Sequence, residues 1–356
     1  KTSQFVAEKL EEMGYEIHRN IGKTGIVANL TVGDSKKAIG LRADMDCIPV
    51  QEVSNLEYKS QHDGCMHACG HDGHVVTLLG AAYLLSKNRN FKGTVRLIFQ
   101  PAEEPGYGAS AMMKDGLFEK FPIEEIYGLH NMPGLAEGTI HARIGGIMAS
   151  EDNFTIKIHG KGGHASAPNL TIDPLAIAAN IIISLQTIVS RNSDPIDTAV
   201  ISCTEILTDG AHNVIPSNVT ILGDTRSFNP KVQELIEKRM KDITENICKA
   251  YGADWEFFYT HEFSPTINTE NCYNIAVQAA KNALGEENVV ENCQPLMSSE
   301  DFAKYLEKVP GCFVFLGGAK EGEEIYSLHH HCYDYNDRNL LKGAKYFEEI
   351  VKISLS

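Results

Sequence analysis

The sequence predicts an α/β fold, in which an open, mostly parallel sheet has helices on both faces and a smaller α+β domain is inserted into the chain. Two observations indicate this. Apolar, strand-like runs alternate with helical stretches in the first 145 residues and again near the C-terminus, as they do where helices connect parallel strands. Between these parts the order becomes strand, helix, strand, strand, helix, strand, which is typical of the ferredoxin-like unit.

The outer parts of the chain supply the elements of the large sheet. We expect strands at 26–30, 38–43, 94–99, 125–129 and 312–316, and helices at 75–86, 109–117, 275–284, 302–306 and 340–353. An amphipathic pattern also runs from Phe5 to Met13. Residues 1–145 and 262–356 are therefore predicted to form one discontinuous domain.

Residues 146–261 are predicted to form the inserted domain. After Gly145 and Gly146, strands are expected at 153–159, 198–206, 218–225 and 254–259, with helices at 174–191 and 231–251. Asp173 followed by Pro174 is a typical helix start. A length of about 115 residues suits a compact domain of its own.

Composition excludes some classes of function. The chain has 32 Lys plus Arg against 47 Asp plus Glu, a formal net charge of -15, which argues against nucleic acid as a partner. The apolar run 177–185 is interrupted by Asn180 and Ser184 and is too short to cross a membrane. Nine cysteines without regular spacing fit a reducing compartment, so we expect a cytoplasmic protein.

The most informative segment is Cys65-Met-His-Ala-Cys-Gly-His-Asp-Gly-His74, which gathers three histidines and two cysteines. Cys69 and His71 stand two residues apart, so both side chains can reach one ion from a single turn. Thiolate and imidazole are ligands that suit zinc and its neighbours. His67 and His74 are either hydrogen-bonding partners of these ligands or ordinary polar residues.

Three further segments end strand-like runs with residues that can bind metal. Glu103 and Glu104 follow one run, His130 ends another, and histidines 329–331 follow the run 311–318. The carboxyl ends of parallel strands meet at one edge of a sheet. One tetrahedral ion takes fewer than five protein ligands, so two metal ions are expected, with five ligands: Cys69, His71, Glu104, His130 and a histidine of 329–331.

Over nearly its whole length the sequence resembles the metal-dependent amidohydrolases, a branch of the dinuclear metallopeptidases that includes hippurate hydrolase, aminoacylases and plant auxin-conjugate hydrolases. The matching segments are Leu41-Arg-Ala-Asp-Met-Asp46, Met66-His-Ala-Cys-Gly-His-Asp-Gly-His74, Gln100-Pro-Ala-Glu-Glu104, Gly128-Leu-His130, Gly163-His-Ala-Ser166, Asn213-Val-Ile-Pro216, Ser299-Glu-Asp-Phe302 and Leu328-His329. The order of these segments and their residues are highly specific to this family.

The resemblance implies a role for each candidate residue. Glu103 would be the general acid/base, and His329 would be the metal-binding histidine of its run, because the family has a single ligand there. In the insert, His164 would polarise the scissile carbonyl, while Asn213 and Arg226 would hold the substrate carboxylate. The resemblance therefore implies five metal ligands: Cys69, His71, Glu104, His130 and His329.

Other residues near these motifs have less certain roles on sequence grounds. Asp44 and Asp46 end a strand at the same edge, and we expect them to hydrogen-bond to ligand histidines rather than bind metal. Asp72 either does the same or caps the helix that follows it. Residues 299–301 are expected to shape the rim of the site or, alternatively, to cap a short helix.

The expected activity is cleavage of the amide bond of N-acyl amino acids, either hippurate-like or N-acetyl, to a carboxylic acid and a free amino acid. An N-acetyl-diaminopimelate deacetylase or a dipeptidase would use the same residues, and a metal-binding protein without activity is the alternative outside the enzymes. The two ions could be Zn, Mn, Co or Ni. The insert is expected to serve as a lid and to join the chain into a homodimer or higher oligomer. In relatives, the residue equivalent to His164 can come from the partner subunit.

Overall fold

The computed structural model describes residues 1–319, 322 and 324–356, and they divide into two compact units. The larger unit contains Lys1–Ile147, Thr266–Pro295 and Glu300–Ser356. The smaller unit contains Met148–Pro265 together with the short segment Leu296–Ser299. This short segment, which the sequence assigns to the discontinuous domain, therefore belongs to the smaller unit.

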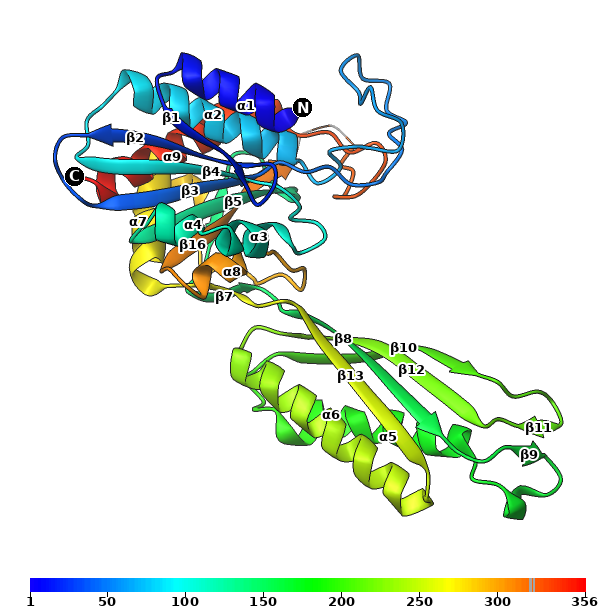
Figure 1. The fold of residues 1–356 in the computed structure, drawn as a ribbon. Helices are drawn as coiled ribbons and strands as arrows, with labels where there is room; N and C mark the ends of the chain where they lie inside the picture. Colours follow the sequence, from blue (N-terminus) through cyan, green and yellow to red (C-terminus); the bar gives the residue numbers. More distant parts are fainter. Residues whose placement is uncertain (320–321, 323) are drawn as a thin grey trace. The chain divides into compact units, whose positions relative to one another are not determined.

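The larger unit is built on an eight-stranded sheet of order β1-β2-β4-β3-β5-β16-β6-β15 (Figure 1). Its four central strands, β4, β3, β5 and β16, are parallel to one another, whereas β1 and β2 add antiparallel pairs at one side and β6 pairs antiparallel with β16. The strand bounds are β1 Glu16–Ile21, β2 Gly25–Val32, β3 Ala38–Asp44, β4 Gly93–Gln100, β5 Glu125–Ala136, β6 Ile140–Ala142, β15 Val289–Glu291 and β16 Gly311–Ala319.

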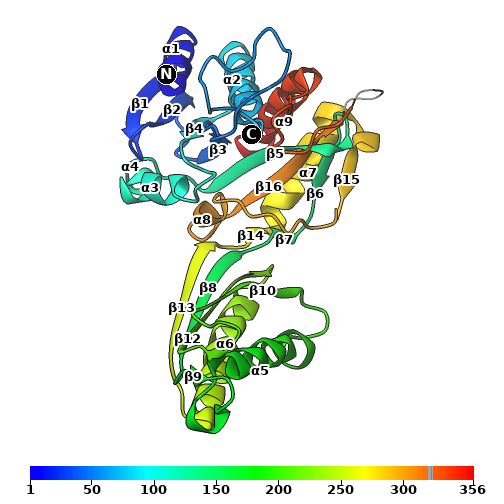
Figure 2. The same ribbon diagram turned by 90° about the vertical axis from the view of Figure 1, so that its right-hand side faces the viewer.

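Helices cover both faces of this sheet, as the α/β prediction requires (Figure 2). One face carries α1 (Thr2–Glu12), α2 (His71–Lys87), α7 (Glu270–Leu284) and α9 (Leu340–Ser354), whose apolar residues share one buried core with the strands. The other face carries the short helices α3 (Gly108–Lys114), α4 (Leu117–Lys120) and α8 (Ala303–Leu306). The α/β fold class predicted from the sequence is confirmed.

Several local predictions need correction. The single helix expected at 109–117 is two helices, because Gly116 adopts a left-handed conformation with φ of 86° and separates α3 from α4. The strands β1, β6 and β15 were not expected. Their sequences carry polar residues or are only three residues long, so they lack the apolar alternation that identifies a strand. The strands β7 (Gly145–Met148) and β14 (Thr266–Asn268), which pair with each other, were missed for the same reason.

The smaller unit is a four-stranded antiparallel sheet with two helices. Its strands, β8 (Glu151–His159), β10 (Ala199–Thr208), β12 (Asn218–Ser227) and β13 (Asp254–Phe263), lie in the order β10-β12-β8-β13. The helices α5 (Pro174–Thr187) and α6 (Pro230–Tyr251) begin with side-chain caps from Asp173 and Asn229. This chain order and strand order are those of the ferredoxin-like unit.

One helical stretch, Pro174–Asn192, is long and apolar enough to cross a membrane by length and composition alone. Its residues Ile177, Ile181 and Leu185 are fully buried in the core of the smaller unit, where they pack with residues of the sheet and of α6. A helix that buries its apolar side against a sheet needs no membrane to cover it, so we interpret this stretch as a core helix.

Candidate metal centre

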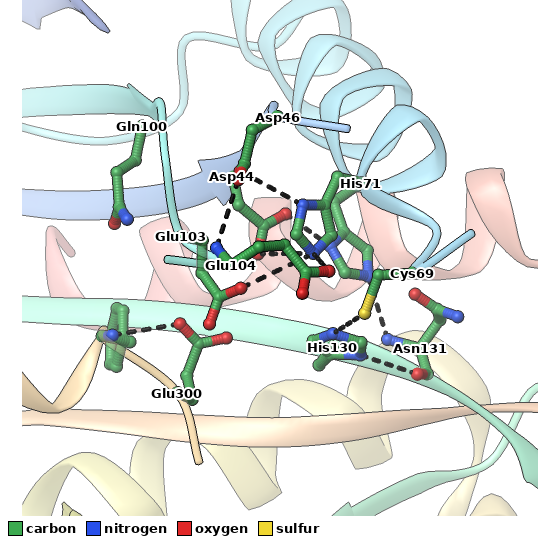
Figure 3. A network of polar contacts seen from close by, with 12 residues as sticks. Asp44, Asp46, Cys69, His71, Gln100, Glu103, Glu104, His130, Asn131 and Glu300 are labelled. Carbon is green, nitrogen blue, oxygen red and sulfur yellow. Dashed lines mark hydrogen bonds and ion pairs between the residues drawn. The ribbon is translucent and has the colours of Figure 1, made fainter. Parts of the chain in front are cut away.

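Two strand ends, the middle of a third strand and one helix start bring the candidate residues together at one edge of the large sheet. The strand β3 ends at Asp44, and β4 ends shortly before Glu103 and Glu104. His130 lies within β5, and α2 begins at His71. Since β3, β4 and β5 are parallel neighbours, their carboxyl ends lie at the same edge. Figure 3 shows the side chains converging there.

Cys69 and His130 form one side of the cluster. The Cys69 Sγ lies 3.4 Å from the His130 Nε2, and both residues are buried. The His130 Nδ1–H donates to the carbonyl oxygen of Asn131 over 2.7 Å, so Nε2 carries the lone pair and faces the thiol. Burial and the neighbouring His74 hold the pKa of His130 well below its usual value. His130 is thus a neutral imidazole ready to bind a metal through Nε2.

His71 occupies the centre of the cluster. Its Nδ1 lies 3.3 Å from the Oδ1 of Asp46, and its Nε2 lies 3.7 Å from Asp44 and 3.9 Å from Glu104. Burial alone would lower the pKa of His71, but the carboxylates of Asp44, Asp46 and Glu104 outweigh it and raise the pKa to about 9. A carboxylate behind a histidine is the usual way to orient a metal ligand, and Asp46 has this position.

Glu104 and His329 form the opposite side of the cluster. The His329 Nε2 lies 3.3 Å from the Glu104 Oε1. The backbone of His329 has a positive φ of 66°, and its N–H donates to the carbonyl of Ala68. The next histidine, His330, instead stacks on Tyr326 with ring centres 4.7 Å apart. Of the histidines in this run, His329 is therefore the one that faces Glu104.

These residues fit a pair of bound cations by two tests. First, Asp46 Oδ1, both ring nitrogens of His71 and Glu104 Oε1 are buried without a hydrogen-bond partner, and such atoms are costly unless something satisfies them. Second, Cys69 belongs to two groups whose ligand atoms lie within 4.8 Å of one another, one with His71 and His130 and one with Glu104 and His329. Two overlapping groups could hold two ions.

Glu103 is a buried carboxyl beside the candidate ligands. Its side chain lies 4.0 Å from the His71 Nε2. Burial and the negative charges of Glu300, Asp301 and Asp44 raise the pKa of Glu103 well above its usual value, while Arg42 opposes them. A carboxyl with a raised pKa next to a metal site can both accept and donate a proton near neutral pH.

A buried network behind the cluster was not predicted. Arg42 is 1% exposed and donates to Asp44, Glu300, Asp301 and Gln100 over 2.8 to 3.1 Å. The expectation that Glu300 and Asp301 shape the rim is therefore wrong, because both are buried and hold the guanidinium. A sequence cannot show that Arg42 is buried, although an arginine inside the apolar strand β3 is a signal.

Asp44 and His74 connect this network to the ligands. The His74 Nδ1–H donates to Asp44 over 2.6 Å, and its Nε2 accepts the N–H of Asn131 over 3.0 Å. Asn131 in turn donates its side-chain amide to the hydroxyl of Tyr333. His74 therefore acts as a hydrogen-bonding partner, one of its two predicted roles. Asp72 is exposed in the first turn of α2, where its charge favours the helix N-terminus.

The three candidate substrate residues lie in the smaller unit. His164 is exposed on the two-residue strand β9 (Gly163–His164), opposite Val214 of β11 (Val214–Ile215), and the N–H of Ala165 donates to the carbonyl of Asn213. Arg226 lies near the far end of β12, about 27 Å of extended chain beyond Asn218. The unit thus brings His164 close to Asn213 but not to Arg226.

Arg226 already has acidic partners. Its Nη1 lies 2.9 Å from Glu151, and its Nε donates to Asp224 over 3.0 Å. A substrate carboxylate would therefore compete with two carboxylates of the protein for this guanidinium.

Comparisons with known proteins agree with the fold. The family model of peptidase family M20/M25/M40 matches residues 40–353. The chain is 42% identical over 349 residues to the hippurate hydrolase of Campylobacter jejuni, covering 98% of this chain and 90% of that protein. It is 37% identical over 353 residues to the N-acetyl-L-cysteine deacetylase of Bacillus subtilis, covering 99% and 83%. A crystal structure of a dinuclear metal-binding peptidase of the M20 family from Bacillus subtilis superimposes with a TM-score of 0.85 at 35% identity, over 99% of this chain and 92% of that one.

The chain therefore belongs to the M20/M25/M40 peptidase family, and it is a hydrolase that acts on amide bonds. The ligand groups and the dinuclear relative together support two divalent metal ions. The family resemblance drawn from the sequence motifs is confirmed.

Proposed function

We propose that the protein is a dinuclear-metal amidohydrolase that cleaves N-acyl amino acids to a carboxylic acid and a free amino acid. The observation that carries this proposal is the pair Glu103 and Glu104. Glu104 faces the candidate ligands His71 and His329, while Glu103 remains a buried carboxyl of raised pKa beside them. A purely structural metal site needs no such extra carboxylate. Both relatives named above release an acyl group from an amino acid, by their names.

In this mechanism, two divalent ions supply the Lewis acidity that polarises the amide carbonyl and activates the attacking water. Zinc, manganese, cobalt and nickel all accept the mixed sulfur, nitrogen and oxygen ligands present. Glu103 accepts a proton from the attacking water and delivers it to the nitrogen of the leaving amine. The residues that would hold the ions are Cys69, His71, Glu104, His130 and His329.

The smaller unit supplies the substrate-binding residues in this proposal. His164 donates a hydrogen bond to the carbonyl oxygen as negative charge develops on it. Arg226 binds the substrate carboxylate, for which a planar guanidinium is suited, and Asn213, whose carbonyl accepts the N–H of Ala165 beside His164, joins it from the same chain as His164. His164 lies on β9, which pairs with β11 just before β12 begins, whereas Arg226 lies near the end of β12. We therefore propose that a substrate held by Arg226 meets the His164 of the partner subunit.

This role for His164 requires a homodimer. Strand β10 forms one edge of the sheet, and its residues Ile206 and Leu207 are half exposed. The helix α5 also exposes 71% of Ile183. An apolar edge strand is a ready surface for pairing with a second copy. We place the protein in the cytoplasm, where reduced cysteines such as Cys69 persist.

Two enzymes of different specificity remain compatible with the same residues, namely an N-acetyl-diaminopimelate deacetylase and a dipeptidase. A metal-binding protein without catalysis is a further alternative. The buried Glu103 argues against the last, since burial of a carboxyl costs stability and a purely structural site needs no extra carboxyl beside its ligands.

The test is amino acid release from N-acetyl, N-benzoyl and indoleacetyl amino acids, N-acetyl-diaminopimelate and dipeptides. Wild type is compared with Glu103→Gln and, as a matched control, Glu104→Gln. We expect Glu103→Gln to keep its metal content and lose at least about 10²-fold in kcat, while Glu104→Gln loses metal. The best substrate identifies the subgroup. Full activity in Glu103→Gln would overturn the mechanism, and no turnover by metal-loaded wild type would overturn the proposed function.

A further inference from the structure

An apolar cleft of about 550 Å³ lies within the larger unit against the candidate metal ligands. Two of its lining residues are Glu104 and His329, which face each other across 3.3 Å. Most of the rest of its wall is apolar: Ile48, Pro49, Val50 and Pro105. The cleft is thus continuous with the place where the reaction would occur, yet the mechanism above assigns it no role.

Hydrogen bonds connect the wall of this cleft to the segments that carry the candidate metal ligands. Ile48 exchanges two backbone hydrogen bonds with Met66, of 3.0 and 3.1 Å, and the N–H of His329 donates to Ala68. The side chain of Ile48 packs in a small buried cluster with Met66 and Ala68. On the other side, the N–H of Glu104 donates to Asp46 over 3.1 Å. An apolar group in the cleft would therefore sit at a defined distance from the ligands.

The chemistry of the wall selects which end of a substrate can enter. The residues described along it include no lysine or arginine. A carboxylate placed among apolar side chains would lose its water without gaining donors. An uncharged apolar group, in contrast, gains free energy by leaving water. In an N-acyl amino acid the amino acid carries the carboxylate, so the acyl end is the one that suits this cleft.

We infer that the cleft lined by Glu104 and His329 is the acyl subsite of the enzyme, and that its wall of Ile48, Pro49, Val50 and Pro105 selects bulky apolar acyl groups, such as aromatic ones, over acetyl. This inference rests on the proposed function and goes beyond it, because it names the substrate class and the residues that choose it. Cys47, which is exposed at the border of the cleft, provides a reporter for its occupancy.

The first test compares kcat/KM for N-benzoylglycine with kcat/KM for N-acetylglycine. Wild type is expected to prefer the benzoyl compound. Val50→Asp places a charge on the wall and should lower this preference at least about tenfold, while the preference for N-acetylleucine over N-acetylglycine stays within about twofold. The control is Val53→Asp, because Val53 is 56% exposed and lines a different cavity. A benzoyl preference that survives in Val50→Asp, or a change confined to the leucine preference, would overturn the inference.

The second test does not depend on turnover or on a variant that folds. Iodoacetamide labelling of the wild-type protein, followed by peptide mass spectrometry, reports the accessibility of Cys47. Benzoate, the apolar product, is expected to slow the labelling of Cys47 at least about threefold, whereas acetate is not. Cys203 of β10 serves as the internal control. Equal labelling with and without benzoate would contradict the subsite. Failure of the proposed function would look different, since wild type would then hydrolyse no compound of the series.

Discussion

At the scale of single residues, the candidate site is organised by groups that do not themselves face the cluster. His130 has one ring nitrogen committed to the carbonyl oxygen of Asn131, which leaves its Nε2 available, whereas His74 has both ring nitrogens committed, one to Asp44 and one to the N–H of Asn131. These bonds decide which nitrogen remains available, because a neutral imidazole has one donor and one acceptor. Arg42 does the same for Asp44 by holding its second oxygen.

Replacing Arg42 tests how much this network stabilises the fold. Arg42→Met leaves the buried carboxylates Asp44, Glu300 and Asp301 without their cation. We expect a loss of about 3–5 kcal/mol in the free energy of unfolding, measured in urea. Arg338→Met is the control, because Arg338 is 61% exposed and its pair with Glu137 should be worth about 1 kcal/mol or less. Equal losses in the two variants would contradict the structural role of Arg42.

The raised pKa values of two candidate ligands predict how metal affinity depends on pH. Burial, together with the carboxylates of Glu104 and Glu103, raises the pKa of the Cys69 thiol well above its usual value. The pKa of His71 is raised to about 9 by carboxylates that outweigh its burial. Below pH 9 a metal ion must therefore displace a proton from each residue, so its affinity is expected to rise with pH.

Between pH 6 and 8 the metal affinity constant is expected to rise by about two log units per pH unit. Competition with a chelator of known proton affinity measures it, and calorimetry in two buffers counts the protons released. Cys69→Ala should remove about one of the two protons. A wild-type affinity that is independent of pH would show that the cluster is already deprotonated.

At the scale of elements, the start of α2 depends on a single glycine. Gly70 lies between Cys69 and His71 with φ of 86°, and a Cβ there would meet the side-chain amide of Asn131 at 2.5 Å. The left-handed backbone turns the chain so that residues on both sides face the cluster, and the missing side chain leaves room for Asn131. The Cys-Gly-His spacing therefore needs glycine for two separate reasons.

Gly70→Ala is expected to reduce metal content and to destabilise the protein by more than the ordinary cost of a left-handed alanine, which is about 1–2 kcal/mol. Gly64→Ala is the matched control, because Gly64 has a similar φ of 70° and open space around it. Thermal unfolding and metal analysis of both variants separate the collision with Asn131 from backbone strain. If the two variants lose the same amount of stability and metal, the contact of residue 70 with Asn131 does not contribute to either.

At the scale of the whole molecule, the assignment of His164 to the partner subunit can be tested by mixing two inactive proteins. His164→Ala and Glu103→Gln are each expected to be inactive. In a mixed dimer, one site combines an intact Glu103 with an intact His164 from the other chain. Random exchange of subunits should then restore about a quarter of the wild-type activity. No recovery in a mixture that light scattering shows to be dimeric would place His164 in its own subunit's site, and a monomeric protein would contradict the dimer itself.

The comparison of prediction and structure shows which features are local. The main strands and helices follow from apolar periodicity, and the α/β class was predicted because these patterns alternate along the chain. The strands β1 and β15 were not predicted, because pairing with the neighbouring strand stabilises an edge strand even where its own sequence lacks a strand pattern. The separation of α3 from α4 at Gly116 was not predicted, because the helical periodicity continues on both sides of this glycine.

By itself, the sequence determined the chemical character of the protein: the residue types that bind metal, their spacing and the family whose motifs they match. Those features depend on side chains and short segments. Only the tertiary structure decided that Arg42 is buried among three carboxylates and that Glu300 and Asp301 lie behind the cluster. These facts depend on contacts between residues up to 259 positions apart, and burial and pairing at such separations follow from packing, which no local pattern records.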